Sequence, residues 1–77
     1  MLLPEQSRMA RAALNWTFND LARAAKLSGN TVLSFEKGIR VRDRSVVQIQ
    51  QALERAGCVF EGNSVKVVKP QPVVSQE

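Results

Sequence analysis

Apolar side chains recur at intervals of three and four residues in the second half of the chain. The positions with this spacing are Val46, Ile49, Leu53 and Ala56, and Val47 and Ala52 widen the same face. A helix carries such a stripe when one of its faces packs on a core. The pattern predicts a helix that begins at Asp43 or Arg44 and ends at Ala56, with Gly57 as its C-terminal stop.

A first helix is predicted over residues 4–14. Pro4 suits the opening position because amide hydrogens in the first turn of a helix have no partner and proline has none to lose, and Glu5 complements the positive end of the helix dipole. Asn15 tolerates the left-handed conformation of a helix end. Trp16 has an apolar body large enough to fill the corner before the next helix, and we expect it in the core.

Two further helices joined by a tight turn are predicted over residues 17–38. Thr17 can cap the first, and Asp20 completes a capping box three positions later. Ser28 can cap the second, which runs toward Gly38 as its stop. The apolar positions that two crossing helices would bury are Leu21, Ala22, Ala25, Leu27, Val32 and Phe35. Because the second helix of such a pair is narrow enough for the DNA major groove, this segment predicts a DNA-binding protein.

The pattern changes to that of a β-hairpin after residue 57. β-Branched residues in segments 59–61 and 64–68 flank Gly62-Asn63, a two-residue turn of permissive composition. The second segment is rich in valine, so the hairpin must pack on the helices, pair with another chain, or do both. Residues 70–77 contain two prolines and no periodic pattern, which predicts a flexible tail.

These elements define the expected fold class, which is all-α with four to five short helices and a C-terminal β-hairpin. The fifth helix would be a single turn around residues 40–43. We assign residues 1–57 to a helix-turn-helix domain, residues 58–69 to the hairpin as a candidate dimerisation element, and residues 70–77 to the tail.

The chain of 77 residues has a net charge of +4, and cations concentrate directly after the second helix of the pair. Lys37, Arg40, Arg42 and Arg44 lie close together there, relieved only by Asp43. Such a cluster would lie beside DNA phosphates if the second helix entered the groove. The alternative is a solvated surface loop, but the position beside the helix pair favours phosphate contact.

The composition speaks against several other classes of function. There is no apolar run of about 20 residues for a membrane span, and we expect no secretory signal. The single cysteine, Cys58, cannot form an internal disulfide and fits a reducing cytoplasm. With no His, no Tyr, one Cys and no Gly-rich phosphate loop, the chain offers no nucleophile–base pair and no metal cluster. We therefore expect that the protein is not an enzyme and that it binds no cofactor and no metal.

Several short groups of residues are spaced along the chain in a way that chance rarely produces. They are Ala10-Arg11, Leu21-Ala22 with Ala25, Ser28 with Thr31-Val32, Phe35-Glu36 with Gly38, and Ala52-Leu53 with Ala56-Gly57. Through them, residues 8–57 resemble the Xre family of helix-turn-helix regulators, which includes the phage Cro and cI repressors. The resemblance implies a lambda-repressor-like fold and a transcriptional regulator, expected to be a repressor, that binds an inverted repeat in double-stranded DNA with residues 28–36 in the major groove.

The resemblance also assigns roles to individual residues. In the family, an arginine of the first helix commonly pairs with a glutamate that ends the recognition helix, and Arg11 and Glu36 occupy those positions. We expect this pair to be structural, because a charge-assisted bond would lock the two helices together. The positions that face base edges are Gly29, Asn30, Leu33 and Ser34.

Asn30 is the best candidate among these readers, because its carboxamide can donate to and accept from adenine at once. Gly29 can only permit close approach. No arginine stands in the set, which predicts modest direct readout of G·C pairs or a greater share for DNA shape. The residues expected to contact phosphates are Thr17, Lys26, Ser28, Thr31, Lys37, Arg40, Arg42 and Arg44.

Three positions depart from the family pattern. Phe18 stands where a phosphate-binding glutamine is common, and Asn15 and Lys26 stand where glycine is common. Lys26 is expected to adopt the left-handed conformation at a cost of about 1 kcal/mol. The same lysine would lie close to the DNA backbone.

The expected partners are double-stranded DNA and a second copy of the chain, since a lone domain of this size makes too few contacts to be selective. The dimer surface is expected on the hairpin, at Val65, Val67 and Val68, or else on the last helix. Two alternatives stay open. One is a DNA-binding antitoxin whose partner toxin occupies the hairpin or tail. The other is a helix-turn-helix domain used as a protein-binding antagonist, which the uncharged reader set and an exposed Phe18 would favour. We expect the protein in the cytoplasm, without a membrane partner.

Overall fold

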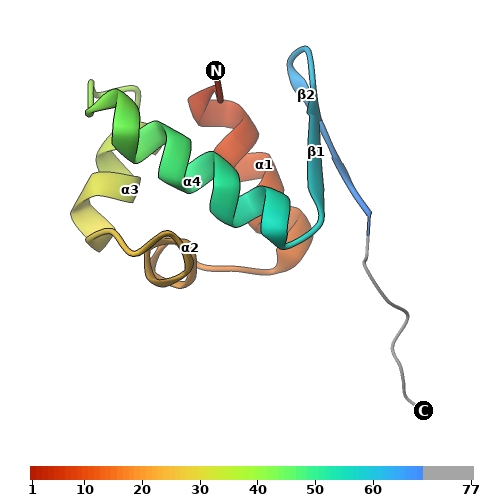
Figure 1. The fold of residues 1–77 in the computed structure, drawn as a ribbon, viewed down its shortest axis with the longest axis horizontal. Coiled ribbons are helices and arrows are strands. Elements are labelled where there is room, and N and C mark those ends of the chain that lie inside the picture. The colour runs from red at the N-terminus through yellow and green to blue at the C-terminus, as the bar shows by residue number, and fades with distance from the viewer. Residues whose placement is uncertain (69–77) are drawn as a thin grey trace.

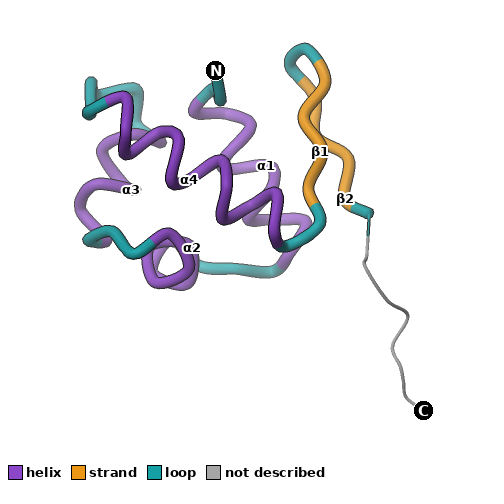
Figure 2. The backbone as a smooth tube through the Cα atoms, viewed as in Figure 1, coloured by secondary structure: helices purple, strands orange, loops and turns teal. Residues whose placement is uncertain are grey.

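The computed structural model describes residues 1–68, which form four helices and one β-hairpin (Figure 1 and Figure 2). The elements are α1 (Pro4–Leu14), α2 (Phe18–Ala25), α3 (Gly29–Glu36), α4 (Asp43–Arg55), β1 (Cys58–Glu61) and β2 (Ser64–Val67). No separate helical turn forms at residues 39–42, so the described chain holds four of the four to five expected helices. The expected tail, residues 70–77, lies outside the described residues, as does residue 69 of the hairpin segment.

The predicted ends of the first three helices are confirmed, and α4 ends at Arg55, one residue before the expected Ala56. Thr17 Oγ1 accepts from the Asp20 amide at 3.1 Å, and Asp20 Oδ2 accepts from the Thr17 amide at 2.9 Å. Ser28 Oγ accepts from the Thr31 amide at 3.2 Å. Asn15 and Lys26 both adopt the left-handed conformation, with φ of 60° and 61°. Each stop therefore falls where the local sequence placed it.

The core lies between the helices and is closed by the hairpin. Its fully buried side chains include Leu21 of α2, Val32 of α3, and Ile49 and Leu53 of α4. The half-buried Trp16 packs against this cluster, as expected. The predicted face of α4 is correct except at Val47, which is 43% exposed.

Side-chain bonds from α4 help to fix α2 against it. The Gln48 amide donates to the carbonyl of Ala25 at 3.2 Å, and Arg55 donates to the carbonyl of Ala24 at 3.4 Å. These acceptors belong to the last turn of α2, where carbonyls lack partners within the helix. The bonds therefore hold the C-terminal end of α2, where the turn to α3 begins.

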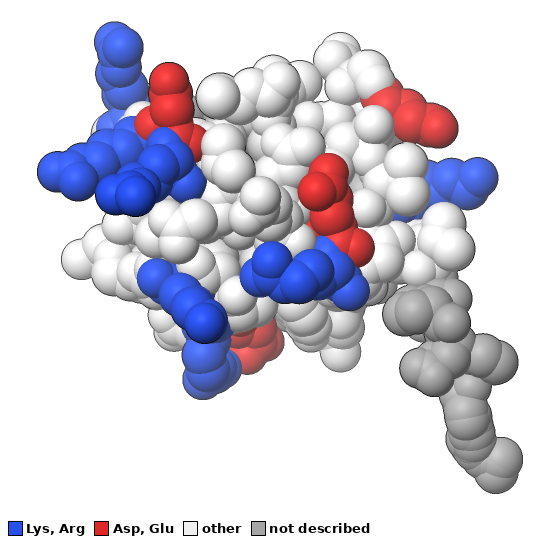
Figure 3. All heavy atoms as spheres, viewed as in Figure 1, with Lys and Arg blue, Asp and Glu red and all other residues white. Residues whose placement is uncertain are grey.

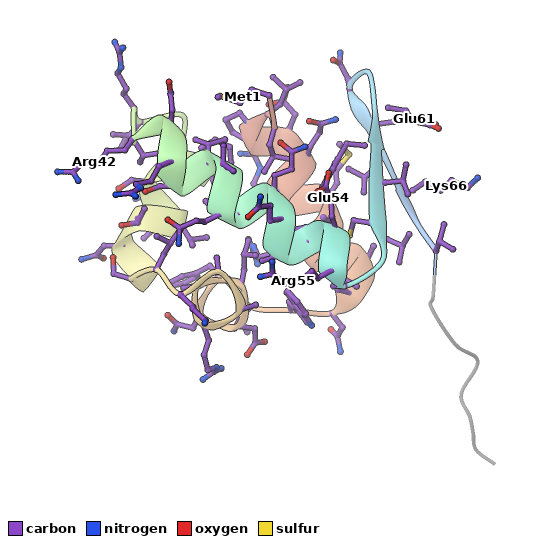
Figure 4. All side chains as sticks on the ribbon, in the orientation of Figure 1. Met1, Arg42, Glu54, Arg55, Glu61 and Lys66 are labelled. Carbon is purple, nitrogen blue, oxygen red and sulfur yellow. The ribbon has the colours of Figure 1, made fainter. Side chains whose placement is uncertain are left out.

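The hairpin pairs its strands in antiparallel register around Gly62, which adopts a φ of 57°. Four side chains form its inner face and pack against the helical core: Cys58, Phe60, Val65 and Val67. Figure 1 shows the hairpin standing beside α1 and α4, and Figure 4 shows Glu61 and Lys66 pointing away from the helices. Packing on the helices, which was one of the outcomes expected for the hairpin, is observed within the chain.

This packing changes the view of the three valines expected at a dimer interface. Val65 and Val67 are half-buried against the core, so their side chains are already largely used within the chain. Val68 is 49% exposed and lies just beyond β2, and Val59 on β1 is 42% exposed. On the hairpin segment, the exposed apolar surface therefore belongs to Val59 and Val68.

Candidate nucleic-acid interface

Helices α2 and α3 are joined by the short turn at residues 26–28. Lys26 makes the turn in the left-handed conformation, and the Leu27 amide donates to the carbonyl of Ala22 at 2.9 Å. Val32 and Phe35 of α3 are buried, so this helix is anchored along one side only. The turn and the anchor together leave the opposite side of α3 facing outward.

The four expected base readers lie on that outward side. Asn30 is exposed, and the other three, Gly29, Leu33 and Ser34, are partly exposed. Their spacing within α3 brings them onto adjacent positions of one helix face. The face is made of a glycine, an asparagine, a leucine and a serine, so it carries no charged side chain.

Cations border this face. Lys26, Lys37, Arg40, Arg42 and Arg44 are all exposed. Figure 3 shows Lys and Arg gathered at the end of the molecule formed by α3 and the start of α4, and in Figure 4 Arg42 extends away from the surface there. Lys26 precedes α3 in the chain, and Lys37 and Arg40 follow it. Arg42 lines a cleft with Thr31 of α3, whereas Arg44 lies beside Val47 and Gln48 of α4.

The three expected hydroxyl contacts are partly engaged within the protein. Thr17 and Ser28 are exposed but serve as helix caps, and Ser28 Oγ lies 2.9 Å from Thr31 Oγ1. Thr31 is half-buried. A phosphate contact by Thr17 or Ser28 would therefore have to be made by a hydroxyl that also caps a helix.

A shallow cleft that sequence reasoning missed lies where α3 meets the start of α4. It is lined by Thr31, Val41, Arg42 and Ser45. Ser45 is buried, and its hydroxyl makes no hydrogen bond to any residue within 1–68. The N-cap residue Arg42 makes no side-chain hydrogen bond to the first turn of α4. Hydroxyls and a guanidinium are hydrogen-bond donors suited to an anion.

Charged and polar side chains of α1 hold the C-terminal end of α3. Arg11 binds both carboxylate oxygens of Glu36, with Nη2–Oε1 at 2.7 Å and Nε–Oε2 at 2.9 Å, so the predicted pair is confirmed. Ser7 Oγ donates to Glu36 Oε2 at 2.7 Å, and Arg8 donates to the main-chain carbonyl of Glu36. The hydrogen bond to Glu36 raises the pKa of Arg11. Sequence reasoning missed Ser7, although its spacing of four from Arg11 places both on one helix face.

The N-terminal end of α3 is packed against the first turn of α2. A Cβ added to Gly29 would lie 2.6 Å from Asn19 Oδ1 and 3.3 Å from the ring of Phe18. Phe18 is half-buried and contacts the core, so the exposed Phe18 that would favour a protein-binding antagonist is not observed. The close approach that Gly29 permits is thus already used inside the protein.

The remaining titratable groups with altered pKa values have structural causes. The Asp20 carboxylate accepts from the Thr17 amide and from Arg23, and these bonds lower its pKa from the ordinary 3.8. Burial raises the pKa of the Cys58 thiol, which keeps it protonated and unreactive. Within residues 1–68, no group of three or more His, Cys, Asp and Glu could hold a metal ion, and no helix is long and apolar enough to cross a membrane.

In comparison with known proteins, no family model and no curated protein matches the chain. The function has to be inferred from the residues of the interface themselves.

Proposed function

We propose that the protein is a sequence-specific regulator of transcription that binds double-stranded DNA, a repressor of the lambda-repressor-like, Xre type acting in the cytoplasm. The observation that carries the proposal is the α2–turn–α3 unit, in which an uncharged polar face of α3 is bordered by the exposed cations Lys26, Lys37, Arg40 and Arg42. A helix of this width fits the major groove, and cations at its sides suit the flanking phosphates.

Base readout and phosphate contact fall to different residues in this proposal. Asn30 pairs with an adenine edge, Leu33 contacts a thymine methyl, and Ser34 bonds a base or a phosphate. The cations supply affinity without regard to sequence. The cleft of Thr31, Arg42 and Ser45 at the start of α4 accepts a phosphate oxygen, which adds Ser45 to the contacts expected from sequence.

The protein would act as a homodimer, because two recognition helices are needed to make binding selective. Since Val65 and Val67 pack inward, the dimer would use the exposed Val59 and Val68 of the hairpin, or Val47 on the outer face of α4. Sedimentation of wild type and a Val59→Ser/Val68→Ser variant separates these surfaces. A variant that stays dimeric places the contact on α4.

A selection from randomised duplexes, followed by gel shifts on the selected site, tests the function. We expect a consensus site with inverted-repeat symmetry, and an Asn30→Ala loss of about 1–3 kcal/mol with relaxed preference at one A·T pair. Asn63→Ala, an exposed asparagine in the hairpin turn, is the matched control. Selection of no consensus would refute the proposal.

The same material addresses the antitoxin alternative. A DNA-binding antitoxin would also select a consensus, but it would co-purify with the product of a neighbouring gene. Purification of the tagged chain alone at full yield, with intact binding to its site, supports a self-sufficient regulator.

A further inference from the structure

The first position of α3 lacks a side chain, and the space is occupied by a side chain from α2. Gly29 opens α3, the position from which a side chain would reach a base edge if α3 lay in the major groove as proposed above. The Asn19 carboxamide oxygen lies 2.6 Å from the place where a Cβ of Gly29 would stand. The amide of Asn19 therefore takes the volume that a side chain at the first position of α3 would fill.

The main chain of Asn19 is held by the capped start of α2. Asn19 is the second residue of α2, between Thr17 and Asp20, whose reciprocal bonds hold the helix start. The Phe18 ring lies 3.3 Å from the same Cβ position and packs, half-buried, against the core.

The amide is also free to bind. Asn19 is exposed, and within residues 1–68 its side chain makes no hydrogen bond. Asparagine offers two donors and two acceptor lone pairs, the set that recognises the N6 and N7 edge of adenine. The neighbouring exposed Asn30 offers the same set from α3.

We propose that Asn19 is a second base-reading residue, which supplies from α2 the carboxamide that α3 lacks at Gly29. This inference rests on the proposed DNA-binding function. The two amides, Asn19 and Asn30, read two base pairs of one half-site, and the lack of a side chain at Gly29 is the condition for the first of them.

Selections from randomised duplexes with the full chain test the inference, with wild type, Asn19→Ala and Gly29→Ala compared. Asn19→Ala should lose about tenfold or more of the preference at one A·T pair, distinct from the pair that Asn30→Ala relaxes, and keep the rest of the consensus. Gly29→Ala should lose preference at the same pair, because its new methyl group displaces a flexible side-chain end that can rotate away. Circular dichroism checks that both variants fold, and Asn63→Ala is again the control.

Other outcomes overturn the inference. If Asn19→Ala weakens binding to all sequences alike and lowers the salt dependence, Asn19 is a phosphate contact and no reader. An unchanged profile and affinity would make it an ordinary surface residue. A wild-type chain that selects no consensus refutes the proposed function itself, whereas a wild-type consensus that Asn19→Ala retains in full refutes only the second reader.

Discussion

Removal of the Glu36 carboxylate should destabilise the protein more than removal of any exposed charge. Only 4% of its side-chain surface is exposed, and it accepts bonds from Arg11 and Ser7. Glu36→Ala leaves the Ser7 hydroxyl, which is fully buried, without its acceptor. It also leaves Arg11 with only the Trp16 carbonyl, at 3.1 Å, among these partners.

The magnitude follows from these two losses. An unsatisfied buried hydroxyl costs about 1–3 kcal/mol. Breaking a fully buried ion pair costs about 3–5 kcal/mol, and Arg11, whose side chain keeps 22% exposure, should fall below that range. We expect a total of about 3–5 kcal/mol, a large share of the roughly 4–10 kcal/mol that a domain of this size has.

Urea denaturation followed by the fluorescence of Trp16, the single tryptophan, measures the loss. A double-mutant cycle with Arg11→Ala should give a coupling of about 2 kcal/mol or more. The apolar pair Arg11→Met/Glu36→Leu should cost less than either alanine variant, because no charge is left buried alone. Glu54→Ala, at an exposed carboxylate, is the control and should stay within about 0.5 kcal/mol. A Glu36→Ala loss below about 1 kcal/mol would refute the reasoning.

Three further predictions concern the basic cluster, the α2 cap and the hairpin. Replacement of Lys37, Arg40 and Arg42 by glutamine should weaken binding to every DNA sequence and lower the salt slope by about 1 for each phosphate that is no longer neutralised, and an unchanged slope would make them plain surface charges. Because the pKa of Asp20 is lowered on folding, its stabilisation is present above the unfolded pKa and is lost as the pH falls through the lowered value. The difference in stability between wild type and Asp20→Asn, measured by urea titration, should therefore be constant near neutral pH. It should shrink toward zero as the pH drops below 3.8, and a difference that grows in acid would contradict this. Gln6→Ala should cost about 1–3 kcal/mol in the same urea assay, because the buried Gln6 amide donates to the carbonyls of Gly62 and Ser64 at 2.9 and 3.2 Å, and a smaller loss would mean that water replaces it.

The helix boundaries could be predicted from sequence because the interactions that set them are local. The Thr17–Asp20 box joins residues three apart, and the left-handed stop at Lys26 lies between two helical patterns. The hairpin turn at Gly62 is equally local. By contrast, no periodic pattern could show that Gln6 would bind the hairpin turn, because the bonded groups are more than fifty positions apart.

The candidate site divides in the same way. The pairing of Arg11 with Glu36 was predicted only through family resemblance, since nothing in a single sequence joins residues 25 positions apart. The Gly29–Asn19 contact and the buried hydroxyl of Ser45 went unpredicted, because both depend on how α3 lies against its neighbours. Val47 was misplaced since the stripe of α4 is narrower than its apolar residues suggested.

The charged and neutral side chains around α3 occupy different positions, so the proposed DNA binding should have an affinity and a sequence specificity that can be changed separately. Glu36 and Arg11 neutralise each other within the fold, so this pair adds no net charge beside the outward face of α3. The cations Lys26, Lys37 and Arg40 flank α3 in the chain, while its outward face carries one amide, one hydroxyl and one apolar side chain. Phosphate contacts depend on salt, whereas neutral hydrogen bonds to bases release no counterions. Substitutions at Asn30 should therefore change the preferred sequence at constant salt slope, and substitutions at Arg42 should change the slope at constant preference.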